Sequence, residues 1–198
     1  MNTLLLIDIQ NDFLPGGSLA VPGGDDVIAV ANAAIESASY VVATQDWHPA
    51  DHGSFASQHV GVEIGQRFQL DGLDQVAWPD HCVQGSVGAE FASKLAIDRI
   101  DHVSRKGTDR LIDSYSGFFD NGRRSATDLD AHLREAGTKE LTVMGLATDY
   151  CVKFTVIDGL RLGYAINVVL AGCRGVNLQA GDVESAIDEM RAAGAVIL

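Results

Sequence analysis

Short apolar runs alternate with segments of helical periodicity along the whole chain. The runs are long enough for β-strands and too short for helices. Because they are apolar on both faces, they are typical of central strands in a parallel sheet. The predicted strands are residues 4–9, 40–44, 141–144 and 166–170, with a weaker one at 102–104 and a last one at 195–198.

Between these runs, apolar residues recur at the three- and four-residue spacing of an amphipathic helix. In the first such segment, Val27 and Ala31 share one face. Gly137, Gly163 and Gly194 stand where a helix C-terminus favours a left-handed residue. The predicted helices are residues 25–37, 89–97, 126–136, 150–162 and 183–193.

This alternation predicts an α/β fold of right-handed βαβ units. Helices would cover both faces of a central, six-stranded, mainly parallel sheet, giving three α/β/α layers. With 198 residues and a typical domain of about 150, we expect a single domain over residues 1–198. Residues 45–86 lack clear periodicity and hold four of the six histidines. Long loops of this kind are often functional.

The composition narrows the class of partner. There are 27 acidic and 14 basic residues, a net charge of −13, which argues against nucleic acid and anionic lipid as partners. No apolar run approaches the roughly 18–20 residues of a membrane-spanning helix. The N-terminus lacks the basic region of a signal peptide, and three cysteines make a disulfide framework unfavourable. We therefore expect a cytoplasmic protein with a small-molecule partner; its oligomeric state stays open, a homo-oligomer included.

Polar residues follow the predicted strands at their carboxyl ends, where open parallel sheets bind ligands. Asp8 follows the first strand, and Asp46 and His48 follow the second. Lys106 ends the third, and Cys151 follows the fourth. A carboxylic acid, a pair of potential metal ligands, an amine and a thiol would thus meet at one edge of the sheet.

Cys151 is a candidate nucleophile in a strand-to-helix turn. Thr148 and Asp149 are suitable N-cap residues, and a helix N-terminus would lower the pKa of the thiol and offer N–H groups to an oxyanion. Asp8 would supply a base and Lys106 a positive charge. The alternative is that all three are structural: a buried cysteine, a capping aspartate and a surface lysine. The remaining cysteines, Cys82 and Cys173, lack this context.

Asp46 and His48 form half of a candidate metal site. In an extended segment, residues two apart point the same way, so a carboxylate and an imidazole would share one face. Zinc, iron and manganese all accept such ligands. The third ligand could come from His52, His59 or His81. The alternative is a set of surface-loop histidines.

Six motifs occur in order along nearly the whole chain. There is no P-loop, no dinucleotide fingerprint, no H-E-x-x-H and no G-x-S-x-G. On the motifs that are present, the sequence resembles the isochorismatase-like cysteine hydrolases, and among them the nicotinamide-hydrolysing members. The motifs are D-x-Q-N-D-F at 8–13, T-Q-D-W-H-P at 44–49, W-P-x-H-C-V at 78–83, K-G at 106–107, D-S-Y-S at 113–116 and G-L-A-T-D-Y-C-V at 145–152.

The resemblance implies a role for each matching residue. The catalytic triad would be Asp8, Lys106 and Cys151, with the N–H groups of Ala147 and Cys151 as the oxyanion hole after a cis peptide at 146–147. The metal ligands would be Asp46, His48 and His81, with His52 a further ligand in some members. Phe13, Trp78 and Tyr115 would form the aromatic walls of the substrate pocket.

The implied reaction is hydrolysis of nicotinamide to nicotinate and ammonia through a cysteine thioester, extending to related carboxamides such as pyrazinamide. One divalent metal ion is expected, with zinc favoured and iron or manganese as alternatives. The rival within the superfamily is a metal-poor amidase of the ureidoacrylate or N-carbamoylsarcosine type, which generally lacks the D-x-H ligands. A catalytically idle binding module on the same fold is the rival outside the enzymes.

Overall fold

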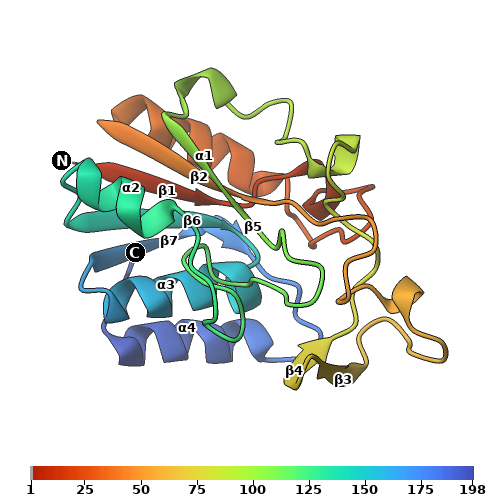
Figure 1. Ribbon diagram of the computed structural model, residues 1–198. Helices are drawn as coiled ribbons and strands as arrows, with labels where there is room; N and C mark the ends of the chain where they lie inside the picture. The colour runs from red at the N-terminus through yellow and green to blue at the C-terminus, as the bar shows by residue number, and fades with distance from the viewer. Residues whose placement is uncertain (1) are drawn as a thin grey trace.

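The computed structural model describes residues 2–198 and contains a six-stranded sheet (Figure 1). The strand order is β5-β2-β1-β6-β7-β8, and each adjacent pair is parallel. The predicted α/β class with a central six-stranded parallel sheet is therefore confirmed. The strands are β1 (Thr3–Ile7), β2 (Tyr40–Asp46), β5 (His102–Lys106), β6 (Glu140–Leu146), β7 (Ala165–Arg174) and β8 (Val196–Ile197).

Helices cover both faces of this sheet. In Figure 1, α1 (Asp26–Ser37) lies above the strands, and α3 (Lys153–Arg161) and α4 (Asp182–Ala193) lie below them. The shorter α2 (Leu129–Glu135) lies beside the end of α3, where Arg134 donates a hydrogen bond to the Leu162 carbonyl. Every residue of β1 is buried, as expected for a strand enclosed by neighbours and by both helix layers.

The three predicted glycine caps are confirmed. Gly137, Gly163 and Gly194 have φ angles of 75°, 94° and 110°, in the left-handed region that glycine adopts at little cost. They follow α2, α3 and α4 respectively.

The helix predicted at residues 89–97 is wrong. Only the short 3-10 turns Val87–Ala89 and Ile97–Arg99 form there. Ala89, Ala92 and Leu95 are buried three residues apart, which imitates a helical period. Their backbone is bonded elsewhere, since the Ala92 N–H donates to the Ile9 carbonyl and the Asn32 side chain bonds both Lys94 and Ala96.

A hairpin interrupts the long aperiodic segment, and the sequence reasoning missed it. Strands β3 (Arg67–Leu70) and β4 (Leu73–Val76) pair antiparallel across Asp71 and Gly72. Both turn residues have positive φ angles, 47° and 80°. Asp-Gly between short alternating segments is a typical signal for such a turn, and it was available in the sequence.

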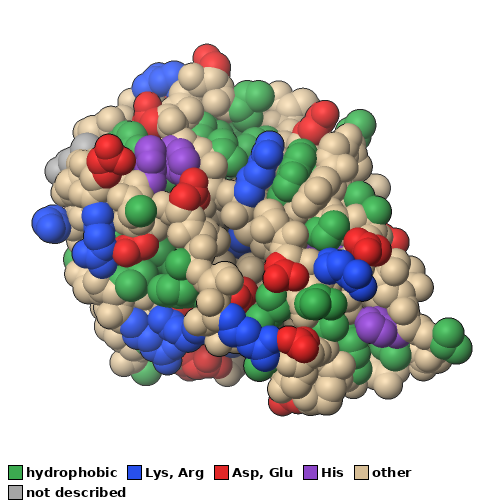
Figure 2. Space-filling model, viewed as in Figure 1, with side chains coloured by type: hydrophobic (Ala, Val, Ile, Leu, Met, Phe, Trp, Pro, Cys, Tyr) green, Lys and Arg blue, Asp and Glu red, His purple; other side chains and the backbone are tan. Residues whose placement is uncertain are grey.

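The topology concentrates polar groups at one edge of the sheet. From central β1 the chain passes to β2 on one side, whereas β6 flanks β1 on the other, so the carboxyl ends of these strands form a topological switch point. Figure 2 shows Lys and Arg interspersed with Asp and Glu on the visible face. Over residues 2–198, no helix is long and apolar enough to cross a membrane.

Candidate active site

Four strand ends bring Asp8, Asp46, Lys106 and Cys151 together. The ammonium Nζ of Lys106 lies 2.9 Å from Asp8 Oδ2, 2.5 Å from Asp46 Oδ1 and 3.4 Å from Cys151 Sγ. It also donates to the Ser114 carbonyl at 2.9 Å. The three candidate triad residues therefore lie close together, although Asp8 and Cys151 are 143 positions apart in the chain.

Two carboxylates surround one ammonium in a buried environment. Burial alone would lower the pKa of Lys106, but Asp46 and Asp8 outweigh it and raise that pKa well above its usual value. Burial raises the pKa of Asp8, and the attraction of Lys106 only partly opposes it. For Asp46, burial is outweighed by Lys106 and His48, which lower its pKa. Asp46 is therefore the firmly ionised carboxylate and Asp8 the one suited to exchange a proton.

The thiol of Cys151 departs from the expectation of a lowered pKa. Burial raises its pKa well above the usual value, and the nearby Lys106 offsets this only in part. The residue sits in a π-helical turn, Thr148–Val152, that precedes α3. Asp149 does not cap this turn, because its carboxylate accepts the Val176 and Asn177 N–H groups. At rest the nucleophile is a thiol, so its proton must leave before attack.

Asp46, His48 and His81 converge on one point. Asp46 Oδ2 lies 3.6 Å from His48 Nε2 and 3.8 Å from His81 Nε2. Each Nδ1 is 2.8 Å from a carbonyl oxygen, of Gly107 for His48 and of Pro79 for His81, so Nδ1 carries the proton and Nε2 keeps its lone pair. His48 Nε2 is buried without a hydrogen-bond partner among residues 2–198. Two nitrogens and one carboxylate oxygen fit a divalent transition metal.

The backbone around His48 is shaped for this arrangement. The His48 N–H donates to the Cys82 carbonyl, which joins the two ligand loops. Gly107 has a φ of 65°, and a Cβ there would lie 2.3 Å from His48 Cε1. Only glycine therefore leaves room for the imidazole against the loop that follows β5.

The other two candidate ligands lie outside this cluster. The Nδ1 of His52 accepts the Ser54 N–H, so its Nε2 carries the proton and offers no lone pair. His52 groups with His48 and Asp113 and not with His81. The His59 Nε2 donates to the Gly53 carbonyl at 2.7 Å.

A narrow pocket is lined both by Cys151 and by two of the candidate metal ligands, Asp46 and His81. It offers about 30 Å³ of open space. Phe13, Trp78 and Tyr115 line it, where the sequence reasoning had placed them, and the Trp78 Nε1–H donates to the Tyr115 hydroxyl at 3.2 Å. Three further lining residues were missed: Leu19 and Val176, which lie in segments without a distinctive motif, and Tyr150, which lies in the motif at 145–152 but was not assigned to the pocket.

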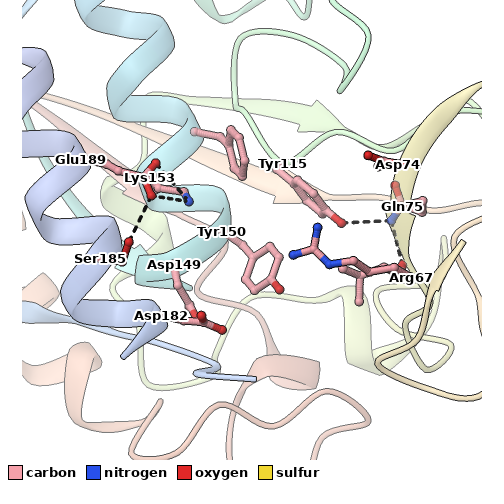
Figure 3. Close-up of a pocket in the computed structure, with 12 residues that line it drawn as sticks. Arg67, Asp74, Gln75, Tyr115, Asp149, Tyr150, Lys153, Asp182, Ser185 and Glu189 are labelled. Carbon is pink, nitrogen blue, oxygen red and sulfur yellow. Dashed lines mark hydrogen bonds and ion pairs between the residues drawn. The ribbon is translucent and has the colours of Figure 1, made fainter. Parts of the chain in front are cut away.

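A larger cavity of about 250 Å³ adjoins this pocket and shares Tyr115 and Tyr150 with it (Figure 3). The β3–β4 hairpin forms one side, and α3 and α4 form the other. Gln75 of the hairpin donates to the Tyr115 hydroxyl at 3.0 Å and to Asp113 at 2.9 Å. The missed hairpin therefore lines the larger cavity and holds Tyr115, one wall of the narrow pocket.

A cis peptide joins Leu146 and Ala147, as the resemblance implied. Ala147 and Cys151 both line the narrow pocket on the side of the thiol.

Comparison with known proteins agrees with this geometry. The chain is 58% identical over 198 residues to a nicotinamidase of Escherichia coli, covering 98% of this chain and 92% of that protein. A nicotinamidase/pyrazinamidase structure from Acinetobacter baumanii matches with a TM-score of 0.96 at 38% identity, covering 100% of this chain and 95% of the other. A pyrazinamidase of Pyrococcus horikoshii in complex with zinc matches with a TM-score of 0.80 at 36% identity, covering 100% and 98%. The Isochorismatase domain model matches residues 2–198, and the chain therefore belongs to the isochorismatase family.

Proposed function

We propose that this protein is a nicotinamidase that hydrolyses nicotinamide to nicotinate and ammonia in a single domain, and that it acts on related aromatic carboxamides such as pyrazinamide. The observation that carries the proposal is the contact of Lys106 Nζ with Asp8 Oδ2 and Cys151 Sγ beside an aromatic pocket. The nicotinamidase from Escherichia coli at 58% identity supports the substrate class.

The first half of the reaction starts from the neutral thiol. Asp8 takes the Cys151 proton, and the sulfur attacks the carboxamide carbon. The oxygen of the tetrahedral intermediate is held by the N–H groups of Ala147 and Cys151. Asp8 returns the proton to the amide nitrogen, the C–N bond breaks, ammonia leaves and a thioester remains.

The second half restores the enzyme. Asp8 takes a proton from water, and the resulting hydroxide attacks the thioester carbon. The C–S bond breaks, the sulfur takes the proton from Asp8, and the carboxylic acid that is released loses its own proton to solvent to become the carboxylate. Throughout, Lys106 offsets the negative charge that moves between Asp8 and Cys151 and holds both in reach.

Asp46, His48 and His81 would hold one divalent metal ion, and zinc fits the two imidazoles and one carboxylate. Support for zinc comes from the zinc complex of the Pyrococcus horikoshii pyrazinamidase, whereas iron and manganese accept the same ligand types. A metal ion held there would supply a positive charge that orients the substrate through the lone pair of its ring nitrogen. Phe13 and Trp78 would clamp the ring itself.

The direct test is ammonia release from nicotinamide by the purified protein. We expect turnover with nicotinamide and with pyrazinamide, and none with ureido compounds. Ammonia from a ureidoacrylate or an N-carbamoyl substrate but not from nicotinamide would overturn the substrate assignment. Absence of any amidase activity would favour a binding module.

Replacing His48 with alanine is expected to lower bound metal from about one equivalent to a small fraction, because two donors alone hold a divalent ion poorly. Elemental analysis of the dialysed protein measures this loss. The KM for nicotinamide is expected to rise more than tenfold, since the ring loses its anchor. His59→Ala is the matched control, because the His59 side chain bonds to the Gly53 carbonyl within the same loop and His59 lies outside the ligand cluster. Full metal content in the His48 variant would contradict the ligand assignment.

A further inference from the structure

Thr44 makes two hydrogen bonds to the same residue, Asp8. Thr44 belongs to β2 and is fully buried. Its Oγ1 accepts the Asp8 backbone N–H at 3.3 Å and donates to Asp8 Oδ1 at 2.6 Å. The directions are fixed, because an amide N–H can only donate, which leaves the hydroxyl proton for the carboxyl oxygen. These two hydrogen bonds close a ring that runs from the Asp8 N–H through the Thr44 hydroxyl to Asp8 Oδ1.

The two oxygens of Asp8 therefore lie in different surroundings. Oδ1 is occupied by the Thr44 hydroxyl. Oδ2 lies 2.9 Å from Lys106 Nζ, which also contacts Cys151 Sγ at 3.4 Å. Oδ2 accepts no hydrogen bond of good geometry from residues 2–198. The oxygen that Thr44 leaves free is therefore the one that shares the Lys106 ammonium with the nucleophile.

We propose that Thr44 is a positioning residue of the hydrolysis and determines which oxygen of Asp8 carries the transferred proton. A hydrogen on Oδ1 would make that oxygen a weaker acceptor for the Thr44 hydroxyl, so the acid form of Asp8 holds its hydrogen on Oδ2. The S–H bond of Cys151 breaks as the Oδ2–H bond forms. The Oδ2–H bond then breaks as an N–H bond forms on the leaving nitrogen. This assignment rests on the proposed function.

Thr44 is itself held in place. Its methyl group packs against Gly117, where a Cβ would lie only 2.7 Å from Thr44 Cγ2. The Gly117 N–H is bonded in turn to Thr155 Oγ1 at 2.8 Å. β2 lies between β1 and β5 in the sheet. The hydroxyl therefore cannot turn to another partner without moving buried backbone.

The test compares Thr44→Val, which removes the hydroxyl at nearly constant volume, with Thr44→Ser, which keeps it. A hydrogen bond to a charged group is strong, so we expect kcat for nicotinamide to fall at least about tenfold in Thr44→Val, with KM within about twofold. Thr44→Ser is expected to keep kcat within about threefold. Thr3→Val is the matched control, because Thr3 is a buried β1 threonine whose hydroxyl bonds to Thr138 at 2.9 Å away from the site.

Metal content is measured in each variant, because Asp46 lies two residues after Thr44. If Thr44→Val does not fold, Thr44→Ala takes its place in the same comparison. A similar kcat in the Thr44 and Thr3 variants, or a loss in Thr44→Ser as large as that in Thr44→Val, would overturn the proposal. If the wild type does not hydrolyse nicotinamide, the substrate assignment fails but the proposal for Thr44 is still tested. The ratios of kcat between variant and wild type are then measured with the carboxamide from which the wild type does release ammonia.

Discussion

The Cys151→Ala variant is expected to lose at least about 10⁴-fold in kcat for nicotinamide hydrolysis, because Cys151 is the one thiol that lines the pocket among residues 2–198. Its metal content is expected to match that of the wild type, since Asp46, His48 and His81 belong to other segments. Nicotinamide binding is expected to persist, because the aromatic walls and the metal ligands are intact. Ammonia release, elemental analysis and calorimetric titration measure the three quantities.

Cys173→Ala is the matched control for this variant. Cys173 is also a buried free thiol, but it contacts the Val169 carbonyl and does not line the pocket. Its variant is expected to keep wild-type kcat. Substantial turnover by Cys151→Ala would exclude the thioester route, and loss of metal from that variant would show that the thiol side of the site supports the ligand loops.

The convergence of the site followed from the strand pattern because a parallel sheet places all its carboxyl ends at one edge. Asp8, Asp46 and Lys106 stand at the ends of β1, β2 and β5, so their proximity needs no knowledge of loop conformation. His81 is different, since it lies in an irregular loop whose place depends on backbone bonds such as that from His48 to Cys82. Only the resemblance, and not periodicity, distinguished it from His52 and His59.

The β3–β4 hairpin was missed although its local signal was present, whereas two other errors came from tertiary effects that local pattern does not encode. The three-residue spacing of Ala89, Ala92 and Leu95 reflects burial in the hydrophobic core, and side-chain bonds from Asn32 replace the helical ones. The pKa of Cys151 was expected to fall because of a helix N-terminus, yet full burial and the facing carboxylates raise it. Charge balance in a buried site depends on the neighbours that folding brings in, and those neighbours are remote in sequence.

Lys106→Met is expected to destabilise the protein by about 3–5 kcal/mol, because it leaves the buried Asp8 and Asp46 carboxylates without their shared cation. Methionine keeps the length and volume of the side chain, so the loss reports charge more than packing. The free energy of unfolding is measured by urea denaturation. Activity is expected to fall by at least about 10³-fold, since the ammonium also contacts Cys151 Sγ.

Lys94→Met is the matched control, because Lys94 is exposed and its ammonium makes no ion pair with residues 2–198. Both variants remove one positive charge from a protein of net charge −13. The difference between their free energies of unfolding therefore reports the effect of the buried position of Lys106. Bound metal could itself offset the carboxylates, and unfolding is therefore measured with and without a chelator. If Lys106→Met were as stable as Lys94→Met under both conditions, the ammonium could not be the group that balances Asp8 and Asp46, and its part in the proposed reaction would be lost as well.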